Sequence, residues 1–162
     1  MNRTSTIIVA GALLVLVAIN AAILRTERRI ANGRTVYLEH APVDPRSLMQ
    51  GDYMTLDYLI DRQKELRQDL EGHRSRGTLV LQIDEDNIAT FARIHDGSPL
   101  ADNETLLRYR RRGWHITTAT ASFFFQEGRA EHYQQAKYSK LRVSPDGVAN
   151  LVALADKDLN PL

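Results

Sequence analysis

An uninterrupted apolar segment near the N-terminus is the feature that most limits how this chain can fold. The segment IIVAGALLVLVAINAAIL, residues 7–24, contains no charged side chain, and Asn20 is its one strongly polar member. As an α-helix it would reach about 27 Å, close to the thickness of the hydrocarbon core of a bilayer. We therefore expect residues 1–34 to form a membrane anchor and juxtamembrane segment, with the transmembrane part at 7–24.

A cleavable signal peptide is the alternative interpretation, because Arg3 precedes the apolar run. The run is longer than a usual signal core of roughly 7–15 residues. Signal peptidases require small residues three and one positions before the cut, and the candidate sites place Ile19 or Asn20 at one of those positions. The sequence therefore favours an uncleaved anchor.

The charges on either side of the anchor bear on its orientation. Arg3 is the one charged side chain before the run, whereas the other flank is more basic and has Glu27 as its single acid. The arginines of that second flank are Arg25, Arg28, Arg29 and Arg34. Taken literally, the positive-inside rule places the following domain in the cytoplasm. The chain has no cysteine, so cysteine usage does not distinguish a reducing from an oxidising compartment.

Charge also limits the class of partner. The chain has 21 basic and 20 acidic residues. Arg3 precedes the apolar run and all the others lie in residues 25–162, so this part of the chain is formally neutral. A nucleic-acid-binding domain usually has a clear basic excess, so we do not expect nucleic acid as a partner. One dense cluster, LLRYRRRGWHI, holds Arg108, Arg110, Arg111 and Arg112. Its favoured interpretation is a solvated, charge-protected strand edge, and its alternative is contact with phosphates or lipid headgroups.

Residues 35–162 have the pattern of a small α+β domain. Alternating apolar residues and turn signals predict about seven strands and two short helices, in an antiparallel sheet or a small open barrel. We expect hairpins at 78–94 and 140–154, a strand at 106–116, and an aromatic strand at 122–125. The helices are expected at 61–71 and near 129–136.

The segment YMTLDYLI, residues 53–60, alternates with a period of two and is predicted to be a strand. One of its faces carries Met54, Leu56, Tyr58 and Ile60. Because this face is the more apolar one, we expect it to be buried.

The string GDYMTLDY, residues 51–58, matches the motif that names the GDYXXLXY family of bacterial membrane-anchored proteins. The strings PVDPRSLMQ, FFFQEGRAEHYQQAKYSKLRV and DGVANLVAL also resemble family blocks, so the resemblance covers nearly all of residues 35–162. It implies a single-pass inner-membrane protein with a periplasmic domain. Because such proteins are often encoded beside multi-pass membrane proteins, it also implies an accessory subunit. This implied topology opposes the literal charge count.

The motif residues have a plain structural interpretation. Gly51 allows a tight turn, and Asp52 can accept hydrogen bonds from exposed N–H groups there. Leu56 and Tyr58 are expected to point into the core, whereas Tyr53 packs its ring and finds a partner for its hydroxyl.

Five residues outside the central motif are further candidates for partner or ligand binding. Asp44 and Arg46 flank Pro45 and can pair with each other or with a partner protein. Glu127 follows three phenylalanines and precedes Gly128, so it is a candidate acid or base if it is buried, and a carboxylate at a helix start otherwise. Tyr138, in AKYSKLRV, would correspond to Tyr53 in a weak internal duplication, for which chance similarity is the alternative.

No set of residues predicts catalysis or a metal centre. The L-x-x-G-D string resembles the strand near the active site of membrane-anchored signal peptidases, but Ser47 is too close to Gly51 to match their nucleophile. No lysine base lies between Lys64 and Lys137. The five histidines are scattered, so neither a metal nor another cofactor is expected.

We therefore expect a non-enzymatic domain that binds a partner, in a membrane complex with a multi-pass protein. The alternative is a domain that binds a small ligand or an envelope polymer, with hydrolytic chemistry left open. The sequence does not decide between a monomer and a homo-oligomer.

Overall fold

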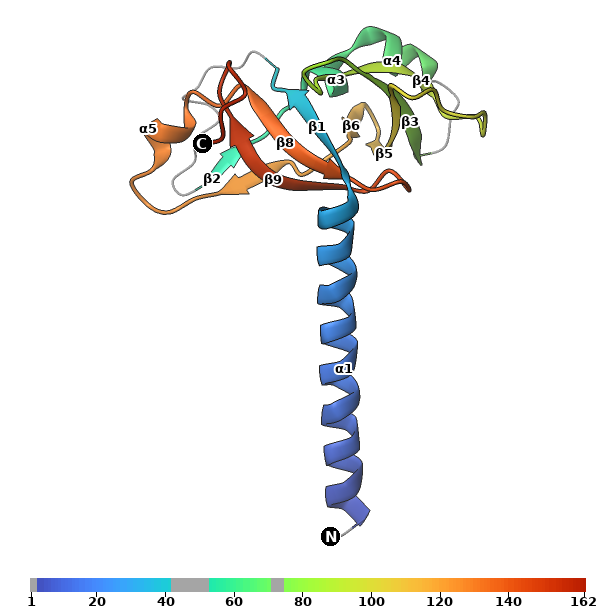
Figure 1. The fold of residues 1–162 in the computed structure, drawn as a ribbon, viewed down its shortest axis with the longest axis vertical. Helices are drawn as coiled ribbons and strands as arrows, with labels where there is room; N and C mark the ends of the chain where they lie inside the picture. The colour runs from blue at the N-terminus through green and yellow to red at the C-terminus, as the bar shows by residue number, and fades with distance from the viewer. Residues whose placement is uncertain (1–2, 42–52, 71–74) are drawn as a thin grey trace.

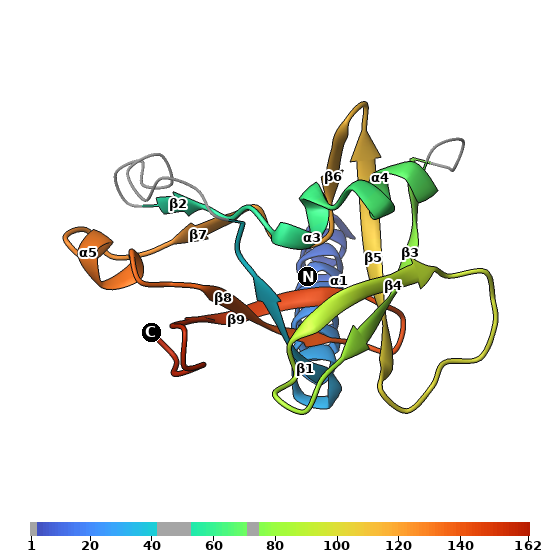
Figure 2. The same cartoon turned by 90° about the horizontal axis from the view of Figure 1, so that it is seen from above.

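The computed structural model describes residues 3–41, 53–70 and 75–162, in which one long helix carries a β-rich domain on its C-terminal end (Figure 1). Helix α1, Arg3–Asn32, includes the apolar run and continues past it to Asn32. Its part Ile7–Asn32 is long and apolar enough to cross a membrane, and no residue in the most apolar stretch of this part is buried within the protein. Seen along the helix, the domain lies across the helix end (Figure 2).

Helix α1 passes into strand β1, Arg34–Glu39, through Gly33 alone. A Cβ atom at Gly33 would lie 2.8 Å from the Arg29 carbonyl oxygen and 3.1 Å from the Val143 backbone nitrogen. The Arg142 side chain donates a hydrogen bond to the Gly33 carbonyl oxygen at 3.0 Å. Glycine is therefore needed for the close approach of the helix end to the neighbouring strand, and the anchor meets the domain without a flexible linker.

The described residues form nine strands in three antiparallel sheets. The orders are β1-β8-β9, β4-β3-β5-β6 and β2-β7. The remaining strands are β2, Tyr53–Thr55; β3, Arg76–Ile83; β4, Ala89–Ile94; β5, Glu104–Arg112; β6, His115–Thr117; β7, Ser122–Phe124; β8, Tyr138–Val143; and β9, Ala149–Ala155. The short helices are α3, Leu59–Arg62; α4, Lys64–Asp69; and α5, Ala130–Tyr133.

The two larger sheets curve toward each other into a half-barrel. The Tyr37 backbone nitrogen donates to the Asn87 carbonyl oxygen at 2.8 Å, which links β1 to the β3–β4 turn. The Arg108 nitrogen donates to the Gly147 carbonyl oxygen at the same distance and links β5 to the β8–β9 turn. Register shifts in β3 and β8 bend both strands. The predicted α+β class is thus confirmed, with an open barrel rather than a single sheet.

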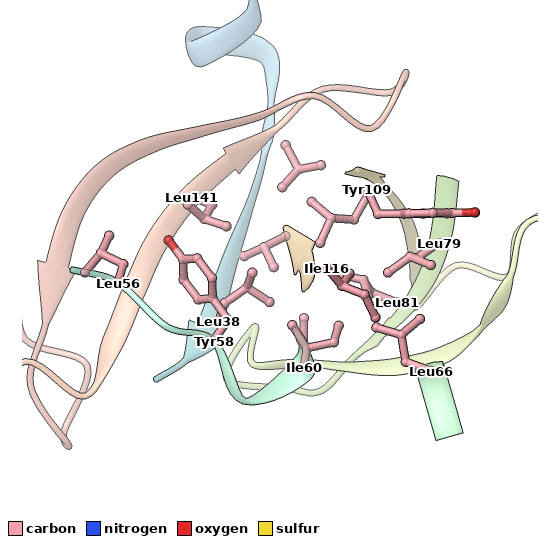
Figure 3. Close-up of a cluster of buried hydrophobic side chains, with 14 of the residues drawn as sticks. Leu38, Leu56, Tyr58, Ile60, Leu66, Leu79, Leu81, Tyr109, Ile116 and Leu141 are labelled. Carbon is pink, nitrogen blue, oxygen red and sulfur yellow. The ribbon is translucent and has the colours of Figure 1, made fainter. Parts of the chain in front are cut away.

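The core lies between these sheets, and the segment 53–70 contributes several of its side chains. Leu56, Tyr58 and Ile60 reach between the β1–β8 side and the β3–β5 side (Figure 3). With Met54 they are at most 4% exposed, which confirms the predicted buried face. Leu66 is fully buried beside them.

The segment 53–70 differs from the prediction in its secondary structure. Residues 53–60 were expected to be one strand and 61–71 one helix, but β2 ends at Thr55, and α3 and α4 follow it. Gln63 is extended, with ψ of 133°, and separates the two helices. The side chains still alternate into the core as far as Ile60, because the backbone around Tyr58 remains extended.

The strand expected at 106–116 is two strands. The chain turns at Gly113 and Trp114, so β5 lies between β3 and β6. The interpretation of the arginine cluster as a strand edge is therefore wrong. Arg108 pairs instead with Asp146 at 2.9 Å, and Arg111 donates to the Leu70 carbonyl oxygen at 2.9 Å.

The packing at Gly33 leads to a prediction about the joint between anchor and domain. Gly33→Ala should lower the free energy of unfolding by about 1–3 kcal/mol, because the added methyl group meets backbone atoms that cannot rotate away. Thermal unfolding of the full chain in a mild detergent, followed by circular dichroism, measures the effect. Gly11→Ala is the control, since a Cβ there has nothing within 4 Å. Equal melting of both variants and the wild type would contradict close packing at Gly33.

Candidate functional site

The described part of the GDYMTLDY motif lies at the junction between the sheets. The Tyr53 ring packs on Phe124 across β2 and β7, with ring centroids 5.6 Å apart. Leu56 and Tyr58 are buried in the core, as predicted. The motif positions Gly51 and Asp52 lie outside the described residues, and so do Asp44 and Arg46.

The backbone of residues 56–58 is held on both sides. The Leu56 nitrogen donates to the Ala121 carbonyl oxygen at 2.9 Å, and the Ala41 nitrogen donates to the Asp57 carbonyl oxygen at 2.8 Å. Tyr58 forms an antiparallel bridge with His40. This segment therefore connects the end of β1 to the chain between β6 and β7.

A buried polar cluster surrounds the Tyr58 hydroxyl. That hydroxyl donates to the Thr120 carbonyl oxygen at 2.8 Å, and burial raises the pKa of Tyr58 to about 12. The His40 ring lies edge-on to Tyr58, and its Nε2 is 2.9 Å from the Ser139 hydroxyl oxygen. Burial lowers the pKa of His40, so this imidazole is held in its neutral form near neutral pH.

A cavity of about 170 Å³ lies beside this cluster. One wall is formed by residues 55–58 and Asp61, and the other by residues from β6 and the chain that follows it. The lining residues of that second wall are His115, Ile116, Thr117, Ala119 and Ala121. The cavity is therefore built against the second half of the family motif.

Asp61 is the distinctive group in this cavity. The Thr118 hydroxyl donates to its Oδ1 at 2.8 Å. Burial raises the pKa of Asp61 from 3.8 to about 6, and the Thr118 hydrogen bond opposes that rise. The nearby Asp57 carboxylate accepts a hydrogen bond from Arg62 Nε at 3.1 Å, so the charge of Asp57 is paired. Asp61 can consequently gain or lose a proton close to neutral pH.

Sequence reasoning missed Asp61, because it placed this residue on a solvated helix at 61–71. The available signal was the alternation of buried side chains that ends at Ile60, because it places the residue immediately before Asp61 inside the domain. No comparable sequence pattern pointed to the other residues near this site, which are His40, Thr118 and Ser139. Their contacts with this region join residues 57–99 positions apart in the sequence.

The other predicted site residues are not brought to the cavity. Glu127 is exposed in a turn, and Gly128 follows it with φ of 81°, a conformation that favours glycine. Helix α5 begins only at Ala130, and its start has no side-chain cap hydrogen bond. Glu127 is therefore not the buried acid or base that was considered. It is also not a carboxylate at a helix start, which was the alternative.

Tyr138 is buried in a small separate cluster with Tyr37 and Ala155. Its strand, β8, pairs with β1 and β9, whereas the strand of Tyr53 pairs with β7. The two tyrosines thus have unrelated pairing, which favours chance similarity over an internal duplication. Within the described residues, no group of three or more histidine or acidic side chains is placed to hold a metal ion.

The GDYXXLXY protein family matches the chain over residues 15–154, which include most of α1 and nearly the whole domain. The chain belongs to the GDYXXLXY family. No curated protein and no solved structure matches it. In this GDYXXLXY protein the described part of the family motif is thus the segment that bridges the two sheets and forms one wall of the Asp61 cavity.

The pKa of Asp61 predicts an unusual dependence of stability on pH. Because the folded state binds this proton more tightly than the unfolded state, the contribution of Asp61 is fully present below about pH 4 and is lost as pH rises through about 6. Between pH 5 and 7 the wild type should lose about 1 kcal/mol relative to Asp61→Asn. Chemical unfolding of both proteins across this range measures the difference.

Two comparisons sharpen this experiment. His40 has a lowered pKa, so its own contribution rises with pH up to about 6.5, but it is present in both proteins and cancels. Asp86→Asn, at an exposed carboxylate of the β3–β4 turn, should show the wild-type pH dependence. Parallel curves for the wild type and Asp61→Asn would show that Asp61 titrates alike in the folded and unfolded states.

Proposed function

We propose that this protein is a single-pass inner-membrane protein without enzymatic activity of its own, whose extracytoplasmic domain binds a partner. As an accessory subunit it would join a multi-pass membrane protein. The observation that carries the proposal is the stiff joint at Gly33 between a wholly exposed apolar helix and the domain. A stiff joint gives the domain a fixed position above the membrane, which a subunit needs if its helix and its domain contact the same partner.

The membrane helix has a feature suited to a neighbouring helix. Asn20 lies within the apolar run, and its side-chain amide donates to the Leu16 carbonyl oxygen at 2.8 Å. Ala18 and Ala22 lie one turn apart on the opposite side of the helix, because residues two positions apart do not share a helix face. Small residues let helices approach closely, and a polar side chain in the hydrocarbon core commonly forms a hydrogen bond with another helix. Both features therefore support helix packing rather than contact with lipid alone.

The partner proposal predicts an effect of one membrane substitution. Purification of the tagged full chain in mild detergent should recover a multi-pass membrane protein in a fixed ratio. Asn20→Leu should reduce that ratio several-fold, since it removes a hydrogen-bonding group worth about 1 kcal/mol between helices. Val17→Leu, an apolar change in the same run, is the matched control. Recovery of the lone protein from the wild type would argue strongly against an accessory subunit.

The extracytoplasmic position is a separate proposal. It is supported by family membership and opposed by the basic flank after Leu24. Alkaline phosphatase fused after Leu162 should be active, whereas a fluorescent protein that matures only in the cytoplasm should stay dark. The reverse pattern would place the domain at the cytoplasmic face and make a cytoplasmic adaptor the better proposal.

A second candidate function is the binding of a small polar ligand, and the Asp61 cavity favours it. The pKa of Asp61 is raised toward neutrality, so Asp61 is the candidate acid or base if the domain has hydrolytic activity. Ala119→Leu would fill the cavity, whereas Ala153→Leu changes β9, outside the lining. Ligand-induced shifts of NMR signals from residues 115–121 that disappear only in Ala119→Leu would support this function.

A further inference from the structure

A groove is lined by the C-terminal end of α1 and by the β8–β9 turn. These two elements meet where the domain joins its anchor (Figure 1). We call it the juxtamembrane groove; its volume is about 560 Å³. The helix contributes Ala21, Leu24, Arg25 and Arg28 to its walls, and the turn contributes Ser144 and Pro145. These helix positions recur every three or four residues and therefore share one face.

The groove has one apolar and one strongly basic part. Ala21 and Leu24 continue the apolar surface of the membrane segment, and the next turn of the helix supplies arginines. Asp146 follows Pro145 in the β8–β9 turn, and it pairs with Arg29 at 3.8 Å and Arg108 at 2.9 Å. Those pairs, with a hydrogen bond from the Ser144 hydroxyl, hold the pKa of Asp146 below its usual value.

Arg25 and Arg28 differ from Arg29 in their partners. Both are exposed, and neither forms an ion pair or hydrogen bond with any residue that the structure describes. Glu27 lies on the same helix but does not line the groove. Two guanidinium groups therefore face this space without a counter-charge, which suits an anion with several oxygen atoms.

The position of the groove along the helix identifies the source of the anion. The apolar run ends at Leu24, and the eight helical residues from Arg25 to Asn32 rise about 12 Å, which is enough to pass through the headgroup layer of a bilayer. A phosphate between Arg25 and Arg28 would consequently lie at the depth of lipid phosphates. The apolar wall below it would lie beside acyl chains.

We propose that the juxtamembrane groove binds the headgroup of an anionic glycerophospholipid. Its phosphate oxygens accept hydrogen bonds from Arg25 and Arg28, and the upper part of an acyl chain packs on Ala21 and Leu24. The lipid then occupies the space between the anchor and the β8–β9 turn and adds to the joint that Gly33 forms. This inference concerns a site distant from Asp61 and does not depend on the partner proposal.

Native mass spectrometry of the full chain in neutral detergent tests the proposal. The probes are phosphatidylglycerol, phosphatidylcholine with the same acyl chains, and soluble glycerol 3-phosphate. The wild type should retain phosphatidylglycerol in preference to the other two. Arg25→Gln with Arg28→Gln should weaken that retention about 25-fold, because each arginine near an anionic lipid contributes a factor of about five.

The control pair, Arg67→Gln with Arg129→Gln, removes the same charge from α4 and from the start of α5, far from the end of α1 (Figure 1). It should retain phosphatidylglycerol like the wild type. If the variant with both glutamines fails to fold, Arg25→Lys with Arg28→Lys replaces it. This lysine variant should bind phosphatidylglycerol more weakly than the wild type, because lysine lacks the planar fork with which arginine donates two hydrogen bonds to one phosphate.

Three results would overturn the proposal. Equal retention of phosphatidylcholine would show that the headgroup charge is not recognised. Equal binding of glycerol 3-phosphate would show a soluble phosphate site instead. An equal loss in the control pair would show an effect of net charge alone.

Discussion

The insertion of Tyr58 between the two larger sheets is the interaction on which the rest of the domain depends. The β1-β8-β9 and β4-β3-β5-β6 sheets share few backbone hydrogen bonds, so side chains must fill the space between them. Tyr58 does so with a ring that is 1% exposed, and its hydroxyl satisfies the Thr120 carbonyl oxygen. A buried phenol needs such a partner, because an unpaired hydroxyl in the core costs about 1–3 kcal/mol. One side chain thus supplies both apolar contact and a polar link across the junction.

This arrangement gives the family motif two roles in one segment. Leu56 and Tyr58 stabilise the junction, and the same residues form one wall of the cavity that holds Asp61. Substitutions at Leu56 or Tyr58 would therefore disturb the fold and the cavity together. Asp61 separates the two roles, since it lines the cavity and does not belong to the main core, whereas Ala119 lines the cavity and also packs against that core.

Much of the fold could be predicted because its signals are local. The apolar run indicates α1, and the β3–β4 hairpin follows from two adjacent alternating strands. The buried face of residues 54–60 was predicted correctly although strand β2 ends early, since the backbone stays extended up to Tyr58 and keeps a period of two. Arg108 and Arg110 alternate with buried Leu107 and Tyr109, so their charges indicate the outer face of β5. They carry no information about which strands lie beside it.

The Asp61 site could not be predicted, because the interactions that create it are not local in the sequence. Its pKa depends on burial by distant elements and on Thr118, which lies 57 positions along the chain. An aspartate after an isoleucine, followed by arginine and glutamine, has the local composition of an exposed helix start. Only the position of α3 against β1 and β6 distinguishes the two cases.

The single residue between α1 and β1 also has a mechanical consequence. A transmembrane helix adapts to a thinner bilayer by tilting, because its apolar length must match the hydrocarbon thickness. Because Gly33 packs against Arg29 and Val143, a lean of the helix would be passed on to the domain. The whole domain would turn with the helix, and its outermost loops would move furthest. If α1 spans a bilayer, a change in bilayer thickness would therefore change the direction in which the domain faces.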